Sequence, residues 1–309
     1  MRCVDSALGL IGQTPLIDLS RVHDGPGRLV AKAEFMQPGG SMKDRAAKAI
    51  LRAARADGRL QPGQPVVEMT SGNIGAGLAV VCAALGHPLV VTMSAGNSPA
   101  RVAMLQALGA EVVLVAQVDG VPGQVTGLDV DAAAAEARRI AQARHAFYVD
   151  QFNAPEGVAA HEAGTGAELV QQVGGRIDAW VAAVGTGCTF TGVARAIRAA
   201  WPDALCVAVE PAGCAPLAGE PVSKVRHVLQ GTGYGSVPPH WDPRLMDRSV
   251  SVTDEEVVHW RRTLAHREGL HVGYSAAANV CAAVKLMASG TLRTDAVVAT
   301  LLCDTGLKY

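Results

Sequence analysis

Short apolar segments alternate along the chain with longer stretches in which apolar residues recur every three to four positions. The first pattern predicts buried strands and the second predicts helices. The predicted strands are residues 29–34, 65–69, 88–93, 111–115, 145–149, 179–184, 205–209 and 296–303. The predicted helices are residues 44–56, 76–85, 100–108, 130–144, 192–200, 253–268 and 276–287. Such alternation is typical of parallel sheets covered by helices on both faces, so we predict an α/β fold.

Composition and charge narrow the class of protein. Lys plus Arg total 27 and Asp plus Glu total 28 among the 309 residues, so the basic excess typical of nucleic-acid binders and of polybasic membrane-surface proteins is absent. The longest apolar run, around residues 75–86, is too short to span a bilayer. We therefore expect neither a nucleic acid nor a membrane as a partner.

The cysteines and the N-terminal residues bear on the compartment. Seven cysteines are an odd number and form no C-x-x-C pair, which argues against a disulfide framework or a zinc ribbon. The nine histidines show no metal-ligand spacing, so we expect no metal. The first residues lack the pattern of a secretory signal. These features favour free thiols in a cytoplasmic protein.

The segment PGGSMKDR, residues 38–45, carries a lysine between a predicted strand and a predicted helix. At the start of a helix the helix dipole disfavours the ammonium form of Lys43, which helps to lower its pKa. A lysine that is neutral near pH 7 can form a Schiff base or act as a general base. The alternative is a solvated lysine that begins a helix.

Three further loops follow predicted strands. The segment TSGNIG, residues 70–75, offers hydroxyl, amide and free backbone N–H donors to a carboxylate. The segment GTGCTFTG, residues 185–192, lets the backbone approach a phosphate and lacks both the Walker and the dinucleotide-binding spacing. The segment CDTG, residues 303–306, places a polar pair directly after a strand. An ordinary helix cap, a plain glycine turn and a chance polar pair are the respective alternatives.

Taken in order, these segments resemble the fold-type II pyridoxal-phosphate (PLP) enzymes of the cysteine synthase and cystathionine β-synthase family. The matching segments, from residue 11 to residue 309, are IGQTPL, PGGSMKDR, TSGNIG, QF, GTGCT, VEP, GTGYG, EGL and DTGLKY. The resemblance implies two three-layer α/β/α domains with mainly parallel sheets and the PLP cleft between them. The smaller, mobile domain is expected over residues 41–147, and the larger domain over 1–40 plus 148–309.

The resemblance also implies roles for individual residues. Lys43 matches the catalytic lysine that forms the Schiff base. The residues implied to bind the cofactor are Lys43, Asn73, Gly185, Thr186, Gly187, Cys188, Thr189 and Thr305. Those implied to hold the substrate α-carboxylate are Thr70, Ser71, Asn73 and Gln151. Thr305 would meet the pyridine nitrogen with a neutral hydroxyl, which favours β-elimination over transamination, and the side chain of Asp304 is expected to point away.

The implied reaction is β-replacement on an O-activated L-serine, O-acetylserine or O-phosphoserine, through an aminoacrylate intermediate. Sulfide or a thiol is the expected nucleophile, which gives L-cysteine or a related amino acid. The alternatives are a nitrogen nucleophile in a specialised pathway of the diaminopropionate or siderophore kind, a lyase, and a catalytically silent relative that binds a partner. The substrates are expected to be small amino acids, and the protein is expected to be a homodimer.

Three features depart from the family pattern. Ile74 replaces a threonine, which would remove a hydrogen bond worth about 1.5–3 kcal/mol, and with Met42 it resembles the siderophore-pathway relatives. Cys188 replaces a glycine, and we expect it to be a tolerated small side chain. Residues 117–129 are predicted to be an unstructured insertion, longer than is usual in cysteine synthases.

Overall fold

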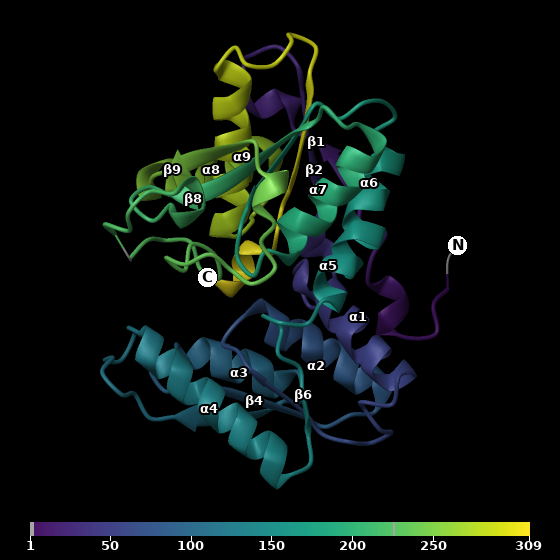
Figure 1. Ribbon diagram of the computed structural model, residues 1–309, viewed down its shortest axis with the longest axis vertical. Helices are drawn as coiled ribbons and strands as arrows, with labels where there is room; N and C mark the ends of the chain where they lie inside the picture. Colours follow the sequence, from purple (N-terminus) through teal and green to yellow (C-terminus); the bar gives the residue numbers. More distant parts are fainter. Residues whose placement is uncertain (1–2, 225) are drawn as a thin grey trace. The chain divides into compact units, whose positions relative to one another are not determined.

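The computed structural model describes residues 3–224 and 226–309. Helices and strands alternate along the chain, and the strands form two separate sheets (Figure 1). This arrangement confirms the predicted α/β fold class. The chain divides into two compact units. Unit 1 comprises residues 3–11 and Gln37–Gly157, and unit 2 comprises Gly12–Met36 and the described part of Val158–Tyr309.

Unit 1 contains a four-stranded parallel sheet in the order β5-β4-β3-β6. Its strands are β3 (Val66–Met69), β4 (Leu89–Ser94), β5 (Glu111–Val115) and β6 (Phe147–Tyr148). Its helices are the 3-10 helix η1 (Ala7–Leu10), α1 (Lys43–Ala56), α2 (Asn73–Leu85), α3 (Pro99–Ala107) and α4 (Gly127–Ala143).

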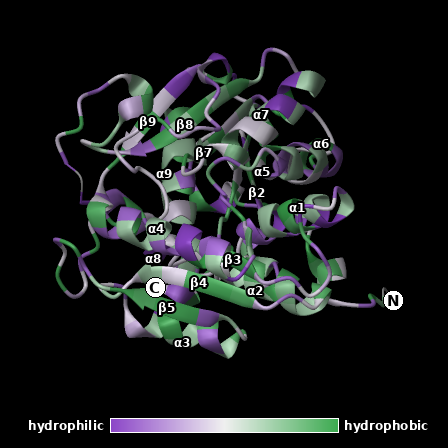
Figure 2. Cartoon of the chain, turned by 60° about the horizontal axis from the view of Figure 1, so that its bottom comes forward, coloured by the Kyte–Doolittle hydropathy of each residue, from purple (hydrophilic) through white to green (hydrophobic). Residues whose placement is uncertain are grey.

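Alternate residues of β3 and β4 point to opposite faces of this sheet and build two apolar clusters. Val66 and Val91 pack with residues of α1 and α2, whereas Val67 and Val90 pack with Ala137 and other residues of α4. The apolar sequences of β4 and β5 stand out in Figure 2. The period of two along each strand therefore produces the three layers of the unit.

Unit 2 contains a six-stranded sheet in the order β1-β2-β10-β7-β8-β9, in which only the β1–β2 pair is antiparallel. Its strands are β1 (Leu16–Asp18), β2 (Arg28–Lys32), β7 (Ala179–Ala183), β8 (Leu205–Pro211), β9 (Arg248–Val252) and β10 (Val297–Leu301). Its longer helices are α6 (Ala167–Gln172), α7 (Cys188–Ala200), α8 (Asp254–Glu268) and α9 (Tyr274–Ala288). Its 3-10 helices are η2 (Ser20–Val22), η3 (Glu34–Met36), η5 (Pro216–Ala218), η6 (Pro243–Leu245) and η7 (Gly306–Lys308).

The helical region between β6 and β7 is the largest part of the fold that the hydrophobic pattern did not predict. It consists of α5 (Glu156–Ala160), the π-helix η4 (His161–Gly166) and α6. The sequence of η4, HEAGTG, contains two glycines and a threonine, which are poor helix formers. Packing against α7 therefore has to stabilise this helix.

The insertion predicted at residues 117–129 has no helix or strand over residues 117–126, apart from an isolated bridge between Val121 and Gln124, but helix α4 already begins at Gly127. The loop is nevertheless held by specific hydrogen bonds. The buried carboxylate of Asp129 accepts hydrogen bonds from the backbone N–H groups of Val118 (2.7 Å) and Thr126 (3.0 Å) and from the side chain of Gln117 (3.2 Å). These hydrogen bonds hold the pKa of Asp129 below its usual range despite burial. One carboxylate thus orders the segment, and together with the hydroxyl of the N-cap residue Thr126 it forms the capping box of helix α4.

Three expectations from the sequence concern the cysteines, membrane-spanning helices and metal ligands. All seven cysteines are free, and six of them are buried. Across residues 3–224 and 226–309, no helix combines the length and apolar character needed to cross a membrane. In the same part of the chain, no group of three or more His, Cys, Asp or Glu side chains could hold a metal ion.

Candidate active site

Lys43 is the first residue of α1, and the loop before it is folded onto the helix. The backbone N–H of Lys43 donates to the hydroxyl of Ser41 (3.3 Å), and the N–H of Gly39 donates to the buried carboxylate of Asp44. A β-carbon on Gly39 would lie 2.5 Å from that carboxylate, so the loop requires glycine there. These contacts fix the backbone from which the Lys43 side chain leaves.

The loop after β3 presents polar groups at the start of α2. Gly72 is the N-cap residue and has no side chain to cap the first N–H groups of the helix, which suits them to an anionic ligand. The hydroxyl of Thr70 accepts from the N–H of Gly72 (3.1 Å), and Arg101 on α3 donates to the hydroxyl of Ser71 (3.3 Å). Ile74 points instead into the apolar core of unit 1, with 3% of its surface exposed.

Gln151 lies beside the same loop because β6 pairs with β3. The buried carboxyl of Glu68, two residues before Thr70, accepts from the N–H of Asp150 (2.9 Å) and also from Gln151. Asp150 adopts a left-handed backbone conformation (φ 48°), which is costly for a residue with a β-carbon. The structure therefore gathers all four predicted carboxylate-binding residues, Thr70, Ser71, Asn73 and Gln151, at the carboxyl end of β3.

Glu68 was not assigned a role from the sequence, although it lies only two residues before the TSGNIG motif. Burial raises the pKa of its carboxyl to about 8 from an ordinary 4.5, and the N–H donors of Asp150 and Gln151 only partly oppose this shift. Between those two pH values the folded chain binds a proton that the unfolded chain does not. The stabilising effect of this proton is complete below pH 4.5 and is lost as the pH rises through 8.

The expected loss of stability with rising pH leads to a prediction for Glu68→Gln, which replaces the carboxyl by a neutral amide of the same shape. In the wild-type protein, Glu68 should lower the free energy of unfolding as the pH rises, by up to about 1.4 kcal/mol per pH unit. The variant should lack this contribution. Urea unfolding of both proteins at about pH 5.5 and about pH 7.5 measures the difference, and equal pH dependence in the two proteins would contradict the assignment.

The glycine-rich loop after β7 forms a cradle at the start of α7. Gly187 is the N-cap residue with φ 90°, and a β-carbon there would lie 2.8 Å from the backbone of His240. A β-carbon on Gly185 would lie 2.3 Å from the carbonyl oxygen of Gly231. Thr186 and Thr189 are both buried, with 5% and 6% of their surface exposed. Backbone N–H groups of a helix start, together with two hydroxyls, fit a phosphate group.

Thr305 follows β10, and its hydroxyl accepts from the N–H of Leu307 (3.3 Å). The hydroxyl hydrogen remains for an acceptor, and an unprotonated pyridine nitrogen is such an acceptor. The neighbouring Asp304 is buried, and its carboxylate accepts from the hydroxyl of Tyr309 (2.5 Å). Thr305 and Asp304 therefore have different hydrogen-bond partners, the backbone of Leu307 and the hydroxyl of Tyr309.

The predicted site residues belong to both units. Lys43, Asn73 and the carboxylate-binding residues lie in unit 1, whereas the glycine-rich loop and Thr305 lie in unit 2. Cys188, in that loop, is the first residue of α7 and is buried. The roles implied for all of these residues stay predictions.

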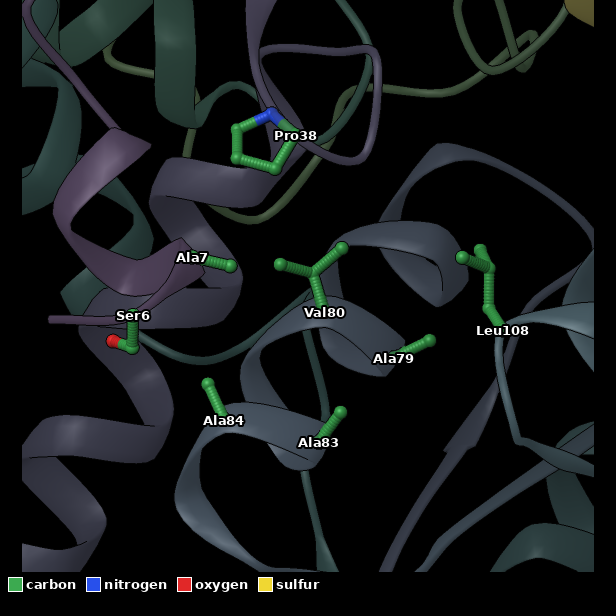
Figure 3. A pocket seen from close by; sticks show the side chains of 8 residues that line it. All are labelled: Ser6, Ala7, Pro38, Ala79, Val80, Ala83, Ala84 and Leu108. Carbon is green, nitrogen blue, oxygen red and sulfur yellow. The ribbon is translucent and has the colours of Figure 1, made fainter. Parts of the chain in front are cut away.

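A cavity of about 370 Å³ in unit 1 lies beside the motifs rather than on them (Figure 3). It is lined by Ser6, Ala7, Pro38, Ala79, Val80, Ala83, Ala84 and Leu108. Apart from Pro38, none of these residues belongs to a motif, and none is titratable. The lining of this cavity therefore offers no titratable acid or base.

A two-unit α/β fold with a lysine at one helix start and a glycine-rich loop at another agrees with the class expected from the sequence, the fold-type II PLP enzymes. The family model described as "Pyridoxal-phosphate dependent enzyme" matches residues 7–304. The chain therefore belongs to this family, and it uses pyridoxal 5'-phosphate as its cofactor.

Individual relatives place the chain more narrowly within the family. A cysteine synthase of Staphylococcus aureus is 36% identical over 309 residues, which cover 99% of this chain and 95% of the relative. The crystal structure of an O-ureido-L-serine synthase matches with a TM-score of 0.89 and 33% identity, over 100% of this chain and 94% of that one. An O-acetylserine sulfhydrylase from Entamoeba histolytica matches with a TM-score of 0.89 and 30% identity, over 100% and 90%. The protein is a PLP-dependent enzyme of the cysteine synthase type.

Proposed function

We propose that the protein catalyses β-replacement on O-acetyl-L-serine, with sulfide or a thiol as the nucleophile and L-cysteine or a related amino acid as the product. The observation that carries this proposal is the match, over nearly the whole length of both chains, to a relative named cysteine synthase. Similarity to a solved O-acetylserine sulfhydrylase supports acetate as the leaving group.

The residues of this chain would divide the work as follows. Lys43 would hold the cofactor, and the cofactor would supply an electron sink for the carbanion at the substrate Cα. The substrate carboxylate would accept hydrogen bonds from the start of α2 and from Gln151. Asn73 would contact the cofactor ring hydroxyl, the loop from Gly185 to Thr189 would bind the phosphate, and Thr305 would donate to the pyridine nitrogen.

The proton movements would all pass through Lys43. The Lys43 amine, released from the cofactor once the substrate is bound, would take the Cα proton while acetate leaves Cβ with the bonding electron pair, and hydrosulfide would then add to Cβ. Lys43 would return the proton to Cα, so that atoms and charges balance over the cycle. General-base action alone contributes about 100- to 10,000-fold in rate.

A second candidate keeps the same chemistry with O-phosphoserine as donor or a nitrogen nucleophile. It is favoured by Ile74, which places an apolar side chain where cysteine synthases have a hydroxyl. The similarity to a solved O-ureido-L-serine synthase, whose named product carries oxygen on Cβ, supports only a nucleophile other than sulfide and does not by itself favour nitrogen. We also propose that residues 41–147 form a mobile smaller domain, that the larger domain is residues 1–40 plus 148–309, and that the protein is a cytoplasmic homodimer.

Product analysis distinguishes these proposals. The holoenzyme is incubated with O-acetylserine or O-phosphoserine, each with sulfide or with an amino-acid amine, and the products are identified by mass spectrometry. We expect cysteine from O-acetylserine and sulfide at the highest rate. A product formed only with the amine would replace the proposal by the second candidate, and no product from either donor would contradict both.

A further inference from the structure

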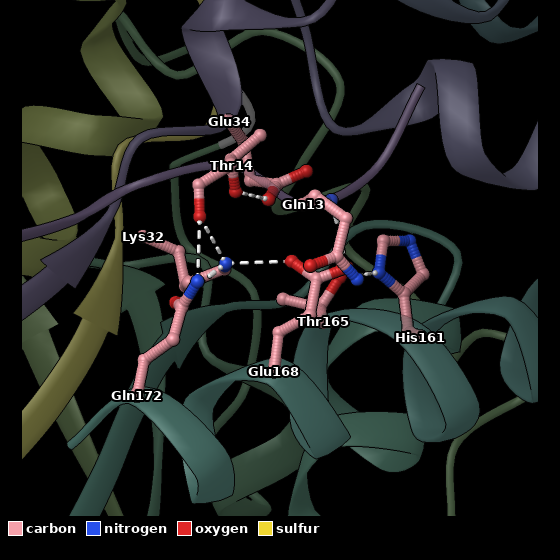
Figure 4. Close-up of polar contacts among 8 residues, drawn as sticks. All are labelled: Gln13, Thr14, Lys32, Glu34, His161, Thr165, Glu168 and Gln172. Atoms are coloured by element: carbon pink, nitrogen blue, oxygen red, sulfur yellow. Dashed lines mark hydrogen bonds and ion pairs between the residues drawn. The ribbon is translucent and has the colours of Figure 1, made fainter. Parts of the chain in front are cut away.

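His161 links the glycine-rich loop of unit 2 to the π-helix η4. Its imidazole is 1% exposed, its Nδ1 lies 2.9 Å from the hydroxyl oxygen of Thr165, and its Nε2 lies 3.1 Å from the hydroxyl oxygen of Thr189. Thr165 is fully buried and is drawn with His161 in Figure 4. The two hydroxyls and the ring between them form one buried chain of hydrogen bonds that reaches the glycine-rich loop.

Close packing of η4 against α7 fixes this chain. A β-carbon on Gly192 of α7 would lie 2.5 Å from the carbonyl oxygen of Val158 and 3.0 Å from Cβ of His161. A β-carbon on Gly166 of η4 would lie 2.5 Å from Cβ of Ala196. Glycines at both contacts let the two helices approach, and π-helical turns occur frequently at functional sites.

The direction of the hydrogen bonds follows from donor counting. A neutral imidazole donates through one ring nitrogen and accepts through the other, and a threonine hydroxyl has one hydrogen to donate. A phosphate dianion offers only acceptors. If Nε2 accepted from Thr189, the hydrogen of Thr189 would be used on the ring. For a neutral ring, Thr189 can therefore donate to a phosphate only when Nε2–H donates to its oxygen and Nδ1 accepts from Thr165.

We propose that His161 is a positioning residue for cofactor binding, held as the Nε2–H tautomer by the hydroxyl of Thr165, so that Thr189 donates its hydrogen to the cofactor phosphate. The inference rests on the proposed role of Thr189 in the phosphate cradle. It assigns functions to His161 and Thr165, which lie outside the motifs that carry the family resemblance.

The tautomer can be observed directly. In the holoenzyme labelled with ¹⁵N-histidine, two-bond ¹⁵N–¹H correlations show which ring nitrogen carries the hydrogen, and the His161 signals are those absent from His161→Asn. We expect hydrogen on Nε2. A ring protonated on Nδ1 alone would overturn the proposal, because Thr189 would then donate to the ring.

Cofactor affinity provides a second, independent readout. Apo-protein is titrated with PLP, and the dissociation constant is compared between wild type and variants. We expect Thr165→Val to weaken binding about three- to tenfold and Thr189→Val about ten- to a hundredfold. The double variant should be no weaker than Thr189→Val, because both changes act through one hydroxyl. Thr165→Ser, which keeps the hydroxyl, should bind PLP as tightly as the wild-type protein does.

Thr92→Val is the matched control. Thr92 is fully buried on β4 of unit 1, and its hydroxyl donates to the carbonyl oxygen of Ala133 (2.8 Å), so the substitution removes one buried hydrogen bond as Thr165→Val does. We expect it to leave the dissociation constant for PLP unchanged. If it weakens binding as much as Thr165→Val, the effect of Thr165→Val is general loss of stability and the proposal fails.

The remaining outcomes separate the inference from the function on which it rests. If Thr189→Val weakens PLP binding and Thr165→Val does not, the hydrogen-bond chain is overturned while the phosphate role of Thr189 stands. Losses that add in the double variant also overturn it. If neither variant changes the affinity, the assignment of Thr189 to the phosphate fails, and the proposal fails with it.

Discussion

Replacing Lys43 with alanine should lower kcat by more than about 10,000-fold, because the variant loses both the covalent anchor of the cofactor and the base for the Cα proton. The fold should survive. The hydrogen bond from Lys43 to Ser41 uses the backbone N–H, which alanine keeps, and alanine has the highest helix propensity for a residue of α1. Product formation and circular dichroism measure the two expectations.

Lys48→Ala is the control on the same helix. The ammonium of Lys48 donates to the backbone carbonyls of Leu8 (2.8 Å) and Ile11 (3.1 Å), so its loss should affect the anchoring of residues 3–11 but not the chemistry. We expect the turnover of this variant to stay within a few-fold of wild type. Turnover of Lys43→Ala within tenfold of wild type would remove Lys43 from its assigned role.

Replacing Lys32 with methionine should destabilise the protein by about 3–5 kcal/mol, because it leaves the carboxylate of Glu168 buried without its cationic partner. The Lys32 ammonium is fully buried, 2.6 Å from that carboxylate, 2.6 Å from the carbonyl oxygen of Thr14 and 2.9 Å from the amide oxygen of Gln172 (Figure 4). The second oxygen of Glu168 accepts from the N–H of Gln13 (3.0 Å). The network ties β2 and the segment before β1 to helix α6.

Urea unfolding measures this effect, and two further variants interpret it. The double variant Lys32→Met with Glu168→Leu should be more stable than Lys32→Met, because it removes the unpaired charge as well. Arg139→Met, which breaks an exposed ion pair with Glu136, should leave the free energy of unfolding unchanged within error. A change below about 1 kcal/mol for Lys32→Met would contradict the view that this buried pair stabilises unit 2.

The hydrophobic pattern predicted most of the fold because most elements carry their own signal. The strand at residues 111–115 and the helix at residues 44–56 match β5 and α1 within one residue. The π-helix η4 carries no such signal. Its two glycines disfavour a helix locally, and it forms because Gly166 and Gly192 permit close packing with α7, which is a long-range condition.

The same distinction explains which functional residues the sequence indicated. The motif loops were found because they follow strands and contain recognisable donors. Glu68 and His161 were not assigned their roles, because those roles depend on partners 82 and 28 positions away, Asp150 and Thr189. A sequence position alone does not reveal such pairs.

Ile74 shows what the structure adds at a position that sequence reasoning did notice. From the sequence, it counts as a lost hydrogen bond to the substrate carboxylate. In the structure it belongs to the apolar core of unit 1, and donors to a carboxylate remain at the uncapped start of α2 and on the neighbouring Ser71. Ile74 therefore changes which groups can donate hydrogen bonds to the substrate carboxylate, but other donors remain.

The visible absorption spectrum of the holoenzyme, recorded before and after addition of O-acetyl-L-serine, tests the proposed function most directly. We predict that the band of the lysine-bound cofactor decays, that a new band appears at longer wavelength, and that sulfide restores the original spectrum while cysteine forms. A spectrum that changes with neither O-acetylserine nor O-phosphoserine would contradict β-replacement on an activated serine, although the cofactor would still be bound.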